Sequence, residues 1–317
     1  MSVTKFTASL KRRGALASHD FGINRRERVA GYCFILPAVI FLLVLVAFPI
    51  GYNIWISLHK VDILTFAGHQ PFIGFENYRE LFDMPILSKA FANTMFFTVM
   101  CIIFQFSIGF ALAVLFSKTF VGNRFFRGIV LICWLIPVMV AGSLWQFMFA
   151  GDSSGMINYF LMNTGIIESP IVFRASPSGS MWSLIIANIW RGVPFNMLLI
   201  ATALTTLPQD VLDAASVDGA GRVKRFWYVI TPILRPAFVG VLVLGFIHTF
   251  KIFELVLIMT GGGPLNATEN LATLSYRLTF IQFELGRGAA VANIMMSVLI
   301  VVGFINLLIM EKDEVIS

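Results

Sequence analysis

The residues that could do chemistry in this chain are a few polar side chains inside long apolar runs. In one run Asn188, Gly192 and Phe195 recur at helical spacing and so share one face of a helix, with Arg191 beside them. Polar groups inside a membrane are costly and mark a pathway by default. Amides that match hydroxyl groups, next to an aromatic platform, are typical of a sugar site. The alternative is that Asn188 only joins neighbouring helices by a polar contact.

A second run carries His248, Thr249, Lys251 and Glu254. Lys251 and Glu254 stand three residues apart, so we interpret them as a structural pair in which each neutralises the other. A basic residue such as Arg191 near a pathway would suit an anionic sugar, for example a phosphate, sulfonate or uronate. A neutral sugar remains the first interpretation.

Composition identifies the environment of these residues. Hydrophobic residues make up 58% of the 317 residues, charged residues only 13%, and the mean hydropathy is +0.84. A soluble domain is normally about 25% charged, so the sequence predicts an integral membrane protein. The three cysteines lie in apolar runs without metal-ligand spacing, so we predict no disulfide and no metal site.

Six stretches are long and apolar enough to cross a bilayer as helices. The predicted fold class is therefore an all-α integral membrane protein with six transmembrane helices. Proline interrupts several spans, and bent helices of this kind suit either a moving pore or ordinary packing. No internal repeat is visible. The predicted spans are 31–57, 93–116, 126–149, 181–205, 237–260 and 288–310.

The basic residues predict the orientation. With the amino terminus inside, fifteen of the 23 Lys and Arg residues fall on the inner side and six on the outer side. The positive-inside rule favours this arrangement. We therefore expect residues 1–30 to be a cytoplasmic basic tail without a cleavable signal, residues 31–317 to be the membrane domain, and both termini to be cytoplasmic.

The inner loop 206–235 is predicted to form two short helices. Thr206 suits a helix cap, Pro208 a first helical turn, and Gly219 a left-handed stop. The second helix is expected over 222–230, ending at Thr231-Pro232, with aromatic residues at the headgroup level. We expect an exposed ridge of small residues that another surface approaches closely, formed by Ala214, Ala215 and Ala220.

The stretch "DAASVDGAGRVKRFWYVITP" resembles the EAA motif of binding-protein-dependent ABC importer permeases. Asp213 stands for the motif's glutamate. The flanks "FIGFENYRELF", "WRGVPFNMLLI" and "MTGGGPLNATENL" are similar to the carbohydrate-uptake, maltose-type first permease branch. The resemblance covers about residues 31–310 and implies a type I importer fold. In it the loop is a coupling helix, here carried by Asp213, Ala214, Ala215, Asp218, Gly219, Ala220, Phe226 and Pro232.

The resemblance also implies the partners. The chain has no G-x-x-x-x-G-K-[ST] phosphate loop, so it binds no cofactor itself, and ATP and Mg are used by a separate ATPase dimer. A second homologous permease, an extracytoplasmic solute-binding protein, the sugar and membrane lipid complete the set, in a bacterial inner membrane and without nucleic acid. The implied membrane sugar site falls on Asn188, Gly192, Phe195, His248, Thr249 and Ile252.

The outer loops 59–92, 150–180 and 261–287 are the expected docking surface for the binding protein. Two other classes were weighed. A gradient-driven carrier needs buried carboxylates along its path, and Glu254 is the only strong acid within a span. A membrane enzyme needs clustered catalytic groups, whereas the histidines are scattered. We therefore predict a non-catalytic transport subunit.

Overall fold

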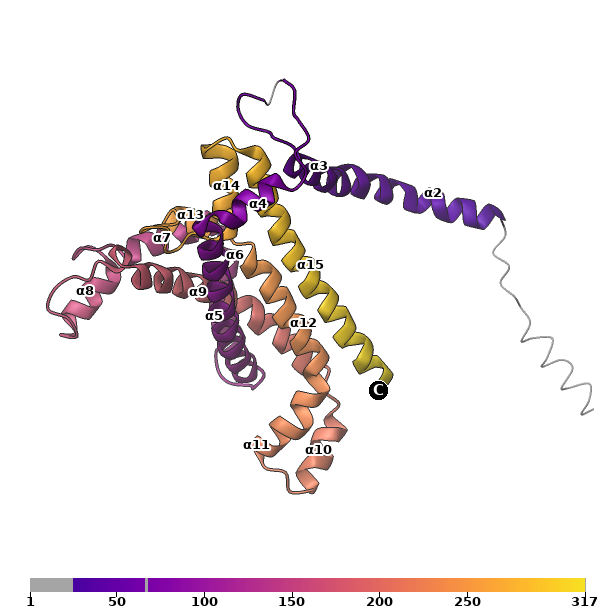
Figure 1. The fold of residues 1–317 in the computed structure, drawn as a ribbon. Helices are drawn as coiled ribbons and strands as arrows, with labels where there is room; N and C mark the ends of the chain where they lie inside the picture. Colours follow the sequence, from indigo (N-terminus) through magenta and orange to yellow (C-terminus); the bar gives the residue numbers. More distant parts are fainter. Residues whose placement is uncertain (1–24, 66–67, 317) are drawn as a thin grey trace, which may run out of the picture. The chain divides into compact units, whose positions relative to one another are not determined.

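The computed structural model describes residues 25–65 and 68–316, and its regular elements are helices apart from one isolated bridge between His59 and Phe72. The chain divides into two units, residues 1–52 and 53–317, which are taken separately below. The predicted tail, residues 1–30, lies mostly outside the described residues. Figure 1 shows the helices of both units.

The described part of the first unit, residues 25–52, is helical. Helix α2 (Arg25–Leu42) continues through a π-helical turn, η1 (Leu43–Ala47), into the first part of α3 (Phe48–Ser57). Together they give an apolar helical stretch, Ala30–Ser57, long enough to cross a membrane. The π turn lies just before Pro49, where the backbone lacks a donor for the regular α-helical bond. This stretch agrees with the predicted range 31–57.

Four further helical stretches are long and apolar enough to span a membrane. They are α5 (Pro85–Phe116), α9 (Pro177–Leu204), the segment Val223–Phe250 and the apolar part of α15 (Leu285–Ile316). A bent pair, α6 (Asn123–Leu135) and α7 (Val138–Met148), turns by 100° at its break. The described residues therefore hold five candidate spans, or six if the bent pair is one span.

Two predicted ranges need correction. The range 126–149 is not one straight helix, because Ile136 before Pro137 adopts an extended conformation and α7 starts anew. The range 237–260 begins in the middle of a helix that ends at Phe250. The apolar residues after it form a separate short helix, α13 (Glu254–Met259), one face of which is buried in the core through Leu255, Val256 and Met259. Hydrophobicity alone does not separate a buried short helix from the end of a span.

Helix α12 (Thr231–Phe250) follows α11 (Arg222–Arg225) through the π turn η3 (Phe226–Ile230) without interruption. The second loop helix therefore does not end at Thr231-Pro232 as predicted, because Pro232 lies in the first turn of α12, where no donor is required. At the far end of α12 in Figure 1 lie α4 (Glu76–Asp83), α13 and α14 (Leu271–Tyr276). Helices α10 (Gln209–Val217) and α11 lie at the opposite end of this unit.

The core of the second unit is built around α5 and α9. A Cβ on Gly109 of α5 would lie 2.8 Å from the Cβ of Asn196 on α9, so only glycine permits this approach. One buried cluster joins α5, α7, α9 and α13, and another joins α5, α9 and α12. A third, which includes Leu81, Phe250 and Leu271, ties α4, α14 and α15 to α5 and α12. These clusters fix α9 and α12, the helices on either side of the loop 206–235.

Candidate substrate cavity and coupling loop

A cavity of about 560 Å³ lies between α9 and the break that follows α12. Helices α5, α6 and α7 contribute further lining residues. All seven residues predicted for the substrate pathway line this cavity, namely Asn188, Arg191, Gly192, Phe195, His248, Thr249 and Ile252. Lys251, Phe253 and Glu254 complete the wall at the break, so the structure brings the two polar runs of the sequence to one place.

The amide groups of the cavity come from α9 and α5. Asn188 is 4% exposed, and its Nδ2 makes no regular hydrogen bond within the described part of the chain, although its side chain interacts with the buried Cys101 thiol of α5. Gln105 of α5 donates from Nε2 to the Asn188 carbonyl at 2.9 Å. A Cβ on Gly192 would lie 2.3 Å from the Gln105 side chain, so this glycine gives the amide its space. A buried donor without a partner is costly unless a bound molecule supplies an acceptor.

Aromatic rings form a second side of the cavity. Trp134 stacks on Phe195 with ring centroids 5.4 Å apart, and Phe195 meets the His248 ring edge-on at 5.8 Å. Stacked and edge-to-face rings at these distances attract each other and hold their faces in place. Sequence reasoning did not identify Trp134 or Gln105. The signal for Gln105 was an amide in the middle of the apolar run 93–116, whereas nothing local separates Trp134 from other tryptophans of the apolar runs.

The charged residues of the cavity pair differently from the prediction. Lys251 and Glu254 form no ion pair with each other in the part of the chain that the structure describes. The break after α12 explains this, because the two residues are no longer three apart on a continuous helix. Glu254 instead acts electrostatically on Arg191 across the cavity. The Nε of Arg191 is buried and has no hydrogen-bond partner among the described residues.

The loop 206–235, hereafter the coupling loop, closes its first helix as predicted at Gly219. This glycine has φ +74°, and the following amide of Ala220 donates to the Ala215 carbonyl at 3.0 Å. Such a left-handed residue after a helix satisfies carbonyls that the last turn leaves free. Asp213 and Asp218 are exposed, and Asp213 accepts a hydrogen bond from Gln209 at 3.0 Å.

Two details of the coupling loop differ from expectation. Thr206 does not cap α10, since its hydroxyl donates to the Ala203 carbonyl of the preceding helix at 2.8 Å. The ridge of small residues is incomplete, because Ala214 is exposed but Ala215 is buried. Ala215 is buried because its face of α10 is turned towards the rest of the loop. Ala220 is half-buried, so Ala214 alone of the three is fully presented.

The coupling loop is held to the membrane helices through Phe226. Its ring lies 5.2 Å from the Phe110 ring of α5, and so it ties the second loop helix to the core. Trp227 and Tyr228 beside it are 61% and 79% exposed. Pro232 is exposed as well. The Phe226–Phe110 contact therefore holds the coupling loop against α5, and the neighbouring side chains of Trp227 and Tyr228 leave apolar surface exposed.

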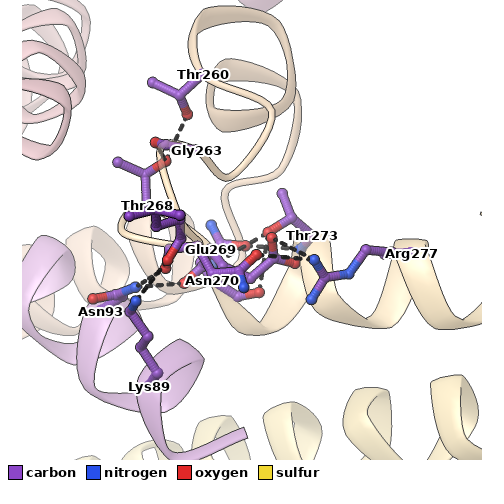
Figure 2. Close-up of polar contacts among 11 residues, drawn as sticks. Lys89, Asn93, Thr260, Gly263, Thr268, Glu269, Asn270, Thr273 and Arg277 are labelled. Carbon is purple, nitrogen blue, oxygen red and sulfur yellow. Dashed lines mark hydrogen bonds and ion pairs between the residues drawn. The ribbon is translucent and has the colours of Figure 1, made fainter. Parts of the chain in front are cut away.

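At the other end of this unit, residues 260–277 form a turn and a short helix, hereafter the outer segment. Gly261 and Gly262 both have positive φ, a conformation that glycine adopts without steric cost. Lys89 and Asn93 of α5 donate to carbonyls of this segment, and Glu269 is paired with Arg277 (Figure 2). Burial raises the pKa of the Glu269 carboxyl, although Arg277 and a hydrogen bond from Thr273 act in the opposite direction.

Helices that can span a membrane, a polar cavity between them and a loop at the opposite end of α12 define a membrane transport subunit. The chain belongs to the family described as binding-protein-dependent transport system inner membrane component, whose model matches residues 105–312. It is thus a permease subunit of an ABC importer, a multi-pass inner-membrane protein and the non-catalytic part of such a system.

Curated relatives are similar over most of their length. The trehalose/maltose transport system permease protein MalF of Thermococcus litoralis is 31% identical, over 80% of this chain and 84% of the relative. The trehalose transport system permease protein SugA of Mycobacterium tuberculosis is 30% identical, over 90% and 89%. The sulfoquinovosyl glycerol transport system permease protein SmoG of Agrobacterium fabrum is 30% identical, over 91% and 92%.

A solved structure has the same fold. A chain in the crystal structure of a bacterial alginate ABC transporter, in complex with an alginate pentasaccharide-bound periplasmic protein, superposes with a TM-score of 0.75. The match covers 89% of this chain and 93% of that one, at 20% sequence identity. The type I importer fold predicted from the coupling loop motif is therefore confirmed.

Proposed function

We propose that this chain forms half of the translocation pathway for a sugar or sugar derivative. The observation that carries the proposal is the cavity, in which buried amides face a stack of aromatic rings. Amides exchange hydrogen bonds with sugar hydroxyls, and an aromatic face packs against the apolar side of a sugar ring. The relatives that transport trehalose, maltose or sulfoquinovosyl glycerol support the same substrate class.

The second part of the proposal concerns the motor. An ATPase dimer that uses ATP and Mg would clasp the coupling loop, with a second homologous permease beside this one. In support, the loop carries the EAA-like residues Asp213 to Gly219 and exposes apolar side chains such as Val217 and Tyr228. The excess of basic residues on this side supports a cytoplasmic position for the loop and for both termini.

The proposed mechanism is alternating access. ATP closes the ATPase dimer and draws the coupling loops together, and the two permeases rock to open outward. A solute-binding protein docked on the outer loops 59–92, 150–180 and 261–287 then releases sugar into the cavity, and hydrolysis restores the inward-open state. This chain contributes the wall of the cavity and the loop on which the motor acts.

The test is uptake by the complete importer in proteoliposomes. ATP and binding protein should drive uptake, and a pH or sodium gradient alone should not; uptake driven by a gradient alone would favour a secondary carrier. Asn188→Ala should weaken uptake without affecting assembly, because it removes the buried amide of the cavity. Asn306→Ala is the matched control, since Asn306 lies on α15 outside the cavity lining. Wild-type kinetics in Asn188→Ala would remove this residue from the site.

One observation favours an anionic sugar derivative as a second candidate. Arg191, His248 and Lys251 line the cavity together with a single carboxylate, Glu254, and the Arg191 Nε is buried without a partner among the described residues. An anionic group on the substrate would satisfy it. Arg191→Gln should then reduce uptake of an anionic solute much more than uptake of its neutral analogue. Equal effects on both solutes would exclude this candidate.

A further inference from the structure

The outer segment contacts the wall of the cavity at two points: the Tyr276 ring lies 4.9 Å from the Phe253 ring, and Asn270 makes a hydrogen bond to the wall. Asn270 donates from Nδ2 to the carbonyl of Ile252 at 2.8 Å. Ile252 lies in the break between α12 and α13 and lines the cavity. Both residues are buried, at 4% and 7% exposure, so no solvent replaces this bond.

Asn270 uses its other polar groups to begin α14. Its Oδ1 accepts from the Thr273 amide at 2.8 Å, and its own amide donates to the Thr273 hydroxyl at 3.0 Å, which forms a capping box. The cap needs only the side-chain oxygen, whereas the bond to Ile252 needs the Nδ2 donor. The two roles of Asn270 are therefore chemically separable.

The outer segment is also fixed to α5. Asn93 donates to the carbonyls of Asn266 and Glu269 at 3.2 and 2.9 Å, and the Thr94 hydroxyl accepts from the Leu271 amide at 3.0 Å. Figure 2 shows Asn93, Glu269, Asn270 and Thr273 in one connected network. A segment anchored in this way moves as a body with the outer end of α5 instead of flexing alone.

The backbone at the break between α12 and α13 depends on a hydrogen bond from another segment of the chain. A carbonyl just beyond the end of a helix has no partner within it, and a buried one must find a partner elsewhere. Ile252 finds it in Asn270, so the position of the cavity wall depends on the outer segment. Within the described residues, no other hydrogen bond connects this segment to Lys251, Ile252 or Phe253.

We propose that Asn270 is a positioning residue for transport, which transmits the state of the outer segment to the cavity wall through the Ile252 carbonyl. The proposal rests on the proposed function, in which the binding protein docks on the outer loops. Docking that shifts or stiffens the outer segment then shifts the wall formed by Lys251, Ile252 and Phe253, and the cavity opens to the solute as the binding protein releases it.

The experiment uses Asn270→Ser and Asn270→Asp in the complete importer. Both keep an oxygen for the α14 cap and lose the donor to Ile252, and Asp also places a negative charge against the carbonyl. Maximal binding-protein-dependent uptake should fall about tenfold, the effect of one lost buried hydrogen bond. The binding-protein concentration for half-maximal uptake should stay within about twofold, because the docking surface is kept.

Hydrogen exchange of the same variants tests the connection itself. Amides at 249–254 should lose protection, while those at 271–276 stay protected because the cap remains. Asn158→Ser is the matched control: this buried amide clamps the loop 150–172 through bonds to Ala150 and Ile171 and does not line the cavity. It should loosen 150–172 and leave 249–254 unchanged.

Wild-type uptake in both Asn270 variants, or unchanged protection at 249–254, would overturn the proposal. Loss of protection at 271–276 as well would also overturn it, because the residue would then be only a structural cap. A wild-type importer without binding-protein-dependent uptake would refute the proposed function, while the exchange measurement would still decide whether the connection exists.

Discussion

The two ends of the membrane domain are built in opposite ways. In the outer segment, Thr268, Glu269 and Asn270 are each less than 5% exposed, and their polar groups bond mainly within the chain. In the coupling loop, Val217 is 88% and Val223 71% exposed. In the first region most of the buried polar groups find partners within the chain, although Leu265 is exposed and the Glu269 Oε1 has no hydrogen-bond partner among the described residues. The second region has fewer such bonds and exposes several apolar side chains.

This difference indicates where each region does its work. An exposed apolar residue such as Val217, which lies outside the candidate membrane spans, is consistent with a protein contact, so we expect a partner surface to cover the coupling loop. The outer segment needs none to hold its shape. It is preorganised, and a preorganised surface loses little conformational entropy when another protein docks on it. We expect substitutions in the two regions to impair transport in different ways.

The largest effect is expected from Gly219→Val. A β-branched residue is strained at φ +74°, so the turn after α10 must change and the loop no longer presents Asp213 and Ala214 correctly. ATP-driven uptake should fall by more than about tenfold while the ATPase keeps hydrolysing, since strain of about 1–3 kcal/mol misplaces the loop. Uptake and hydrolysis measured together on one preparation check this.

Gly221→Ala is the matched control for that prediction. A Cβ at Gly221 meets nothing within 4 Å, and its φ is not among the positive values. The variant should transport like wild type. If Gly219→Val also transports normally, the coupling loop is not the contact on which the motor acts.

A smaller loss is expected from Gly262→Ala in the outer segment. The added Cβ would lie 2.2 Å from the Glu269 Oε2, and φ there is +86°, so the carboxylate must move away from Arg277. We expect binding-protein-dependent uptake to fall about tenfold or less, in line with a strained turn of about 1–1.5 kcal/mol. In contrast to Gly219→Val, hydrolysis stimulated by the binding protein should fall in parallel with uptake.

Gly68→Ala provides the comparison in another of the loops predicted to be on the outer side. A Cβ there meets nothing within 4 Å, so the variant should behave as wild type. If uptake falls in Gly262→Ala while hydrolysis stimulated by the binding protein stays at the wild-type level, the outer segment does not act upstream of the motor.

The sequence was sufficient for the class of fold and for the polar cavity residues on α9 and at the end of α12, although not for Gln105 or Trp134, and the reason is physical. A polar residue in a long apolar run is rare enough to be informative, and Asn188 and His248 are both of this kind. The left-handed turn at Gly219 was predictable because few other residues adopt that conformation.

The features that could not be predicted depend on contacts between distant segments. The end of α12 at Phe250 follows from the packing of α13 in the core, and hydrophobicity is the same on both sides of the break. The burial of Ala215 depends on how α10 folds back on its own loop. Asn270 reads locally as a helix cap, and nothing in its neighbourhood shows that its amide reaches Ile252, 18 residues away.

A third prediction compares the two regions directly. When the ATPase subunits are added to the detergent-solubilised permease, amides at 209–225 should become protected by several-fold, because a partner covers a loop that is exposed alone. Amides at 260–277 should change little, since hydrogen bonds within the chain already protect them. Hydrogen exchange with mass spectrometry measures both in one experiment. Equal protection of both regions would contradict the contrast.

The smallest expected effect is a pH dependence confined to the outer segment. Burial raises the pKa of Glu269 above its ordinary value, so the folded segment binds the proton more tightly than the unfolded one. The linked stability is fully present below about pH 4.3 and is lost as the pH rises through the raised pKa.

Protection of amides at 260–277, corrected for the intrinsic exchange rates, should therefore decrease as the pH rises through this window, while protection at 209–225 should not follow the same curve. Glu269→Gln should flatten the dependence, because its neutral side chain does not titrate and its amide replaces the protonated carboxyl. Glu284→Gln, which removes a carboxylate paired with Arg287 outside the segment, should leave the dependence unchanged. A segment that becomes better protected as the pH rises would mean that the attraction of Arg277, and not the burial of Glu269, dominates this end of the molecule.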